Sequence, residues 1–220
     1  MASPRSNTPA PRRVGRPPGP TEHGAASRER ILDAAATVFA QLGYDRARMA
    51  DVIEVSGMTK GSVYFHFESK EALAVAVLTE KHARWIEQVR TRLAAAPPGL
   101  PRLEALLPAV LEMHRDDHDA WVISRLSQNL AAVPATRPLA VELTRRWIDD
   151  VAELIREAQR IGDITGDTDP DLLATVLVGA FDGVKMTIEV LSDDAATADQ
   201  RLEASGGVLL TMLRSAVAPR

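Results

Sequence analysis

The chain has 220 residues, of which 45% are hydrophobic, and a formal net charge of −4. It contains no cysteine, which excludes disulfides, zinc fingers and thiol nucleophiles. No stretch approaches the roughly 20 uninterrupted apolar residues of a membrane span, and no apolar run follows the N-terminal arginines, so neither a span nor a secretory signal is expected. Residues 1–79 carry net charge +2 and residues 80–220 carry −6, so the N-terminal part is better suited to meet phosphates.

Residues 1–24 have the composition of a disordered tail. Six of the fourteen prolines lie between Pro4 and Pro20, together with four arginines. Such a segment cannot bury enough apolar surface to offset the entropy lost on ordering. Its segment Arg13-Val14-Gly15-Arg16-Pro17 resembles minor-groove hooks, so the tail either contacts DNA weakly or only keeps the protein in solution.

Residues 25–73 are predicted to form three helices in a helix-turn-helix domain. Ser27 is a plausible N-cap for a first amphipathic helix that Gly43 ends. Asp45 is a candidate cap for the second helix and Thr59 for the third, and a turn at Gly57 lies between them. In this layout one helix supports the turn and the next presents polar side chains to the major groove.

Residues 74–220 are predicted to form a larger helical domain. A fourth helix starts at Ser69 and runs to about Ala96, where a proline-rich segment interrupts the pattern. No strand alternation occurs, so the predicted fold is all-α with about nine helices. The later helices are expected at Leu103–Arg115, Ala120–Val133, Pro138–Ile161, Pro170–Leu191 and Ala195–Val217. Gly162 is expected to end the third of these, and Asp169 to be the N-cap of the fourth.

One segment of about fifty residues resembles the DNA-binding signature of TetR-family transcriptional regulators. The residues that carry this resemblance are Gly43-Tyr44, Asp51-Val52, Gly57, Thr59-Lys60-Gly61, Tyr64, His66-Phe67 and Ser69-Lys70-Glu71. Within the family, a looser resemblance to γ-butyrolactone (autoregulator) receptors rests on Lys60 to Phe67, Arg125-Leu126, Trp147-Ile148 and Val178 to Gly183. The resemblance implies a homodimeric repressor that binds a palindromic DNA operator and is released by a small-molecule inducer, with no cofactor.

The third helix is expected to supply most DNA contacts. Lys60 is long enough to reach guanine in the major groove, and Thr59 with nearby backbone amides can hold a phosphate. The full set of expected contacts is Arg48, Thr59, Lys60, Gly61, Ser62, Tyr64, His66 and Lys70. The chain has Arg48 where the family usually has threonine, Ala50 where an arginine often reads a base, and Ile53 where alanine is usual. These departures shift base discrimination towards Lys60 and Ser62.

A ligand pocket is expected in the larger domain, where the three tryptophans of the chain lie. Trp147 matches the position of the ligand-covering tryptophan in γ-butyrolactone receptors, and an indole over an apolar cavity suits a lactone with an alkyl tail. A packed core tryptophan is the alternative for Trp147 and for Trp121. The expected ligand contacts are His82, Trp85, Trp121, Ser127, Gln128, Trp147 and Thr187.

The helix from Pro170 to Leu191 has too many apolar positions for a single stripe. Such a helix is either enclosed in its own core or paired with a partner chain. Since a protein with two DNA-binding domains is needed to bind the two half-sites of an operator, a dimer interface is favoured. Its expected residues are Leu173, Val176, Leu177, Ala180, Phe181, Val184, Leu209 and Leu213.

His114 and His118 are four residues apart and share a helix face, but they lack the glutamate of a metalloprotease motif, so no metal site is expected. No catalytic triad or phosphate loop is found, so an enzyme is not expected either.

Two alternatives remain beside the γ-butyrolactone-type repressor. One is a small-molecule-binding protein with weakened DNA recognition; the other is a TetR-type regulator of drug efflux or lipid metabolism. A cytoplasmic location follows from each reading.

Overall fold

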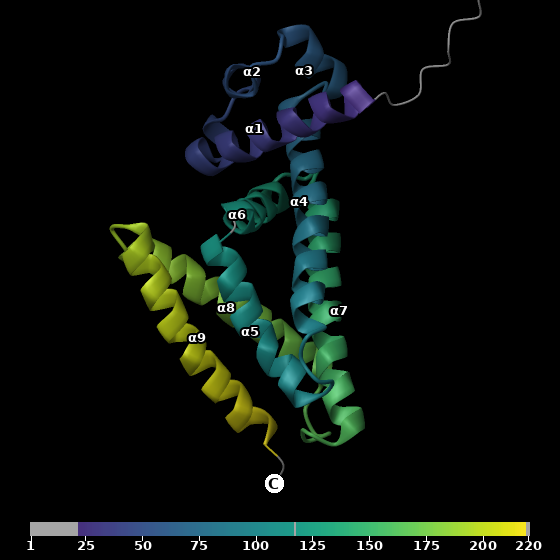
Figure 1. Cartoon of the computed structure of the whole chain (residues 1–220), viewed down its shortest axis with the longest axis vertical. Coiled ribbons are helices and arrows are strands. Elements are labelled where there is room, and N and C mark those ends of the chain that lie inside the picture. Colours follow the sequence, from purple (N-terminus) through teal and green to yellow (C-terminus); the bar gives the residue numbers. More distant parts are fainter. Residues whose placement is uncertain (1–21, 117, 219–220) are drawn as a thin grey trace, which may run out of the picture.

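The computed structural model describes residues 22–116 and 118–218, and in this part of the chain it has nine helices and no strand (Figure 1). The predicted all-α class is therefore confirmed. The predicted tail lies outside the described residues except for positions 22–24, which are already helical. The helices are α1 (Glu22–Arg46), α2 (Met49–Ser56), α3 (Lys60–His66), α4 (Lys70–Leu93), α5 (Leu100–Asp116), α6 (His118–Ala132), α7 (Arg137–Ile161), α8 (Pro170–Leu191) and α9 (Ala195–Val217).

Helix α1 is longer than its sequence pattern indicated. The predicted cap, Ser27, lies inside the helix and is buried, because the chain is already helical from Glu22. Gly43 kinks the helix with a φ of 74°, and one more turn follows it. Asp45 lies in that turn, so it does not cap α2 as predicted. The carboxylate of Asp51 instead accepts a hydrogen bond of 2.8 Å from the backbone N–H at the start of α2.

The turn between α2 and α3 forms as the sequence predicted. Gly57 ends α2 in the left-handed conformation, with a φ of 62° that side-chain-bearing residues rarely adopt. The Thr59 hydroxyl accepts from the backbone N–H of Ser62 at 3.2 Å, which confirms its role as the cap of α3. Val52 and Val63 are buried inside the resulting unit and hold the two short helices against α1.

Helix α4 joins the N-terminal head, made of α1 to α3, to the rest of the chain. Ser69, where the helix was predicted to start, is its N-cap, and the N-terminal half of α4 packs on α1 through Leu73, Val77 and Leu78. The joint also has ion pairs between α1 and α4: Arg28–Glu80 at 2.5 Å, Lys81–Asp33 at 2.8 Å and Arg84–Glu29 at 3.0 Å. Figure 1 shows α4 leaving the head and running beside α7.

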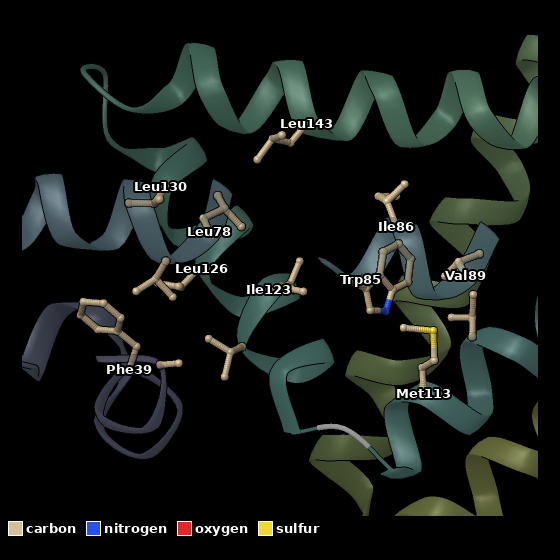
Figure 2. Packing of buried hydrophobic residues seen from close by; sticks show 14 of the residues in the cluster. Phe39, Leu78, Trp85, Ile86, Val89, Met113, Ile123, Leu126, Leu130 and Leu143 are labelled. Atoms are coloured by element: carbon tan, nitrogen blue, oxygen red, sulfur yellow. The ribbon is translucent and has the colours of Figure 1, made fainter. Parts of the chain in front are cut away.

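Helices α5 to α9 form the body. Gly162 ends α7 with a φ of 88°, and the Asp169 carboxylate caps α8 by accepting from the next two backbone N–H groups, both as predicted. Figure 2 shows that the core is continuous from the head into the body, with Phe39 of α1 near Leu126 and Leu130 of α6. Of the helices described, none is both long and apolar enough to cross a membrane.

Candidate nucleic-acid interface and ligand cavity

The outer face of α3 carries most of the residues expected to contact DNA. Thr59, Lys60 and Gly61 are exposed, while Ser62 and His66 are half-buried. The Lys60 ammonium lies 5.8 Å from the centre of the Tyr64 ring, whose side chain is also exposed. The Lys60 ammonium, the Gly61 backbone and the Tyr64 phenol thus lie on one exposed surface. Such groups can bind the base edges and phosphates of a DNA major groove.

Phe65 belongs to the same surface, although sequence reasoning did not single it out. It is 84% exposed, more than the other aromatic side chains described in the head. Val63 and Phe67 are buried four residues apart, so Phe65, two positions from each, must face outward. That periodicity is the signal that could have identified Phe65. An exposed aromatic at this position suits contact with a thymine methyl group.

Two of the expected DNA contacts have intramolecular partners. The Arg48 guanidinium forms an ion pair of 2.9 Å with Asp51, but its side chain is 77% exposed and can still reach a phosphate. Lys70 donates to the backbone carbonyls of Tyr44 at 2.8 Å and Asp45 at 3.2 Å. The structure therefore gives Lys70 a role that was not predicted: it binds the C-terminal carbonyls of α1, which its charge favours.

A cavity of about 340 Å³ lies between α4 and the body, and its walls come from α4 to α9. Trp85 and Trp147 meet edge to face on its wall, with ring centres 4.7 Å apart, and the His82 ring lies 6.2 Å from Trp85. Burial lowers the pKa of His82. Ser127 and Gln128 also line the cavity, so the fold brings together five of the seven expected ligand contacts. The size and mainly apolar lining are typical of small-molecule sites.

The other two expected ligand contacts have different outcomes. Thr187 is exposed and donates to the carbonyl of Gly183 at 2.8 Å, so the prediction that it faces the cavity is wrong. Two residues from Lys185, it lies on the opposite side of α8 from the cavity wall. The side chain of Trp121 lies outside the described residues.

The polar end of the cavity is formed by residues that the sequence did not reveal as a group. Lys185 is 2% exposed, and its ammonium donates to the Ser124 hydroxyl and to Asp182 at 3.1 Å. It also lies 3.4 Å from Nε2 of His114. Burial and the nearby ammonium lower the pKa of His114 to about 4, and burial lowers the pKa of Lys185. Within the described residues, no group of three or more potential metal ligands gathers here or elsewhere.

The apolar surface of α8 and α9 differs from the predicted dimer interface. Leu173 and Leu213 are buried in their own protomer, and Leu177, Phe181 and Leu209 line the cavity. Ala180 and Val184 are half-buried, which leaves Val176 as the one predicted position that is fully exposed. The sequence could not separate these faces because the helix is apolar all round. The outward apolar face consists of Leu172, Val176, Met186 and Val190 of α8 and Val208 and Met212 of α9.

Two sequence profiles match the chain. The profile of bacterial regulatory proteins of the TetR family matches residues 31–77, and the profile of the tetracycline repressor-like C-terminal domain matches residues 99–203. These ranges fall on the head with the start of α4 and on the body, respectively.

Individual proteins agree with the profiles. The A-factor receptor protein of Streptomyces griseus is 31% identical over 78% of this chain, which spans only 57% of that protein. The transcriptional repressor AcnR of Corynebacterium diphtheriae is 31% identical, over 71% of this chain and 77% of its own length. A solved structure described as the molecular basis for control of antibiotic production by bacterial hormones is 30% identical, with a TM-score of 0.69 over 84% of this chain and 96% of the other.

Proposed function

The chain belongs to the TetR family of bacterial transcriptional regulators, and we propose that it acts as a homodimer that leaves a palindromic operator when a small molecule fills its cavity. Like the relatives it matches, it is a DNA-binding regulator rather than an enzyme. Because a repressor works where the chromosome is, we place it in the cytoplasm.

The observation that carries this proposal is the position of α4. It begins immediately after α3, and His82 and Trp85 lie on the same helix about four turns later, on the cavity wall. A molecule that pushes on these two side chains therefore displaces the element that supports the DNA-reading helix. In a dimer, such a displacement changes the spacing of the two recognition helices, which must stay one helical turn of DNA apart.

The outward apolar face supports the dimer. Together with Gly179 and Gly183, its four α8 members are spaced three or four residues apart, so these six positions form one continuous stripe. The two glycines are exposed and allow a neighbouring helix to approach closely. Packing this stripe against its copy about a two-fold axis would bury it and place two heads on one operator.

We propose a γ-butyrolactone-type molecule as the inducer. The apolar cavity, its paired tryptophans and the similarity to the A-factor receptor protein support this ligand class. A regulator of drug efflux or of lipid metabolism is the alternative, and it would take a ligand of different charge or shape.

A mobility-shift assay with the DNA upstream of the chain's own gene tests the repressor. We expect a complex that weakens steeply as salt rises, because Lys and Arg contacts to phosphates release counterions. The absence of any salt-sensitive complex on any sequence would favour the second candidate, a binding protein whose head no longer reads DNA. The arginine and alanine at positions 48 and 50 motivate that candidate.

A Trp147→Ala variant tests the inducer site. We expect it to keep operator binding and to lose release by a butyrolactone-type molecule, since the ring that lines the cavity is removed. Truncating a large core side chain costs about 3–5 kcal/mol, so circular dichroism and a melting curve must show that the variant folds. Thr187→Ala is the matched control, because Thr187 lies in the same domain outside the cavity. Unchanged release in Trp147→Ala would remove this residue from the site.

A further inference from the structure

One end of the cavity is formed by an ion pair in which Lys185 is buried and Asp182 is half-exposed. Lys185 and Asp182 belong to α8, while the partners Ser124 and His114 come from α6 and α5. Taking an ammonium out of water is costly, and a well-packed apolar side chain would stabilise the three helices at least as well. A charge retained at that cost on the wall of a cavity indicates a role in recognising what enters it.

Among the described residues, the charges that line the cavity sum to zero. The titratable lining residues in this part of the chain are His82, His114, Asp182 and Lys185. Nδ1 of His114 lies 2.8 Å from the carbonyl of Val110 and therefore donates to it, which leaves Nε2 as an acceptor facing the ammonium. Both histidines have lowered pKa values and are neutral near pH 7. The ammonium and the carboxylate remain, one positive and one negative.

The hydrogen-bond directions favour an uncharged acceptor as the ligand group. The Ser124 oxygen accepts from Lys185, so its own hydrogen is directed elsewhere and can serve a ligand oxygen. Ser127 and Gln128 follow three and four residues later on the same helix and also line the cavity. A carbonyl oxygen can accept from this polar strip. A carboxylate would bring a second negative charge close to Asp182, whose charge already compensates the ammonium.

We propose that Asp182 determines the charge selectivity of the cavity. By balancing Lys185, it makes the polar end neutral, so that the cavity takes uncharged carbonyl compounds and rejects carboxylates of the same carbon skeleton. This inference rests on the proposed role of the cavity as the inducer site and adds a specificity-determining residue to it.

The test compares two probes with one skeleton: γ-decalactone, which is neutral, and its ring-opened form 4-hydroxydecanoate, which is an anion. Binding to the full chain is followed by the fluorescence of the tryptophans, two of which line the cavity. We expect the unmodified protein to bind the lactone at least about tenfold more tightly. Asp182→Asn removes this carboxylate from beside the ammonium, so the anion should gain about tenfold or more relative to the lactone, a change of about 1.4 kcal/mol.

Two further variants make the test decisive. Asp171→Asn carries the same substitution on the same helix, where the carboxylate pairs with Arg156 outside the cavity, and should leave the preference unchanged. Lys185→Gln removes the cation and keeps Asp182, so the anion should bind even less well than to the unmodified protein. This second variant gives an answer even if Asp182→Asn fails to fold.

Three results would overturn the proposal: the same lactone-to-anion ratio in Asp182→Asn and the unmodified protein, tighter binding of the anion by the unmodified protein, or no binding of either probe. Mobility shifts on the same preparations keep the proposed function separate. A chain that binds DNA but does not discriminate between the probes refutes the charge selection alone. A chain that discriminates between the probes but never binds DNA refutes the repressor alone.

Discussion

The head and the body of this protein place their functional groups in opposite ways. In the head, Lys60, Tyr64 and Phe65 face outward from a helix of seven residues, and a cap and a turn within a few positions hold that helix in place. In the body, Lys185 meets partners 61 and 71 positions away and is almost fully buried. Substitutions on the outer face of the head should therefore alter one contact each. Substitutions in the cavity should alter several helices together.

The outward face of α8 gives the largest expected effect. In a dimer, Val176→Asp introduces two unpaired carboxylates into an apolar interface, at a cost of several kcal/mol for each. We expect sedimentation equilibrium to show a monomer, with operator affinity reduced accordingly. Ile161→Asp is the control, since Ile161 has a similar exposed fraction, 53% against 63%, at the end of α7. A dimer that persists in Val176→Asp would place the interface on another surface.

Lys60→Ala tests whether the head reads bases. Loss of a bidentate contact to guanine costs about 1–3 kcal/mol for each half-site, so operator affinity should fall about tenfold or more. Fluorescence anisotropy at one fixed salt concentration should show a smaller loss on random DNA. Arg92→Ala removes an exposed cation near the far end of α4 and should change neither affinity. Equal losses on the operator and on random DNA would mean that Lys60 contacts only phosphates.

The polar end of the cavity should make the fold sensitive to acid. The pKa of His114 is about 4 in the folded chain and near 6.5 when unfolded, so the unfolded state takes up the proton first as the pH falls. The contribution of His114 to the free energy of unfolding is therefore full above pH 6.5. It is lost as the pH falls towards 4, by up to about 3 kcal/mol. Urea unfolding between pH 7 and pH 4.5 should show this loss, and His114→Gln should reduce it. The same pH dependence in both proteins would mean that other groups cause it.

These regions also differ in how far the sequence could predict them. Thr59 and Asp169 were identified as caps because each acts on backbone groups two or three residues away. Asp45 failed as a cap because a glycine kink, rather than a stop, let α1 continue past it. The predicted ends of the two longest body helices were accurate to one residue, since a glycine and a capping aspartate mark them.

The site in the body could not be assembled from the sequence for a physical reason. Which face of an all-apolar helix turns inward depends on its neighbours in space, so Leu173 and Phe181 were expected to face a partner, whereas Leu173 is buried in its own chain and Phe181 lines the cavity. Similarly, nothing in the sequence distinguishes Lys185 from a lysine on the surface. It becomes part of a site only because packing brings α5, α6 and α8 together around its ammonium.

Arg125 connects the two regions and should have the smallest effect. It lies on α6, pairs with Glu189 of α8, and donates to the carbonyl of Ala40 in α1 at 3.4 Å. Its neighbour Ser124 binds the ammonium in the cavity, so adjacent residues of one helix contact the ligand region and the head. We expect Arg125→Gln to keep operator binding and to weaken release by the inducer, by about 0.5–2 kcal/mol of coupling.

The measurement for Arg125→Gln is the ratio of operator affinities with and without γ-decalactone. Arg146→Gln is the control, because Arg146 pairs with Glu142 within α7. Coupling between two ligands is reciprocal, so the same factor must appear when inducer affinity is measured with and without operator DNA. If both ratios equal those of the unmodified protein, Arg125 does not transmit the signal from the cavity to the head.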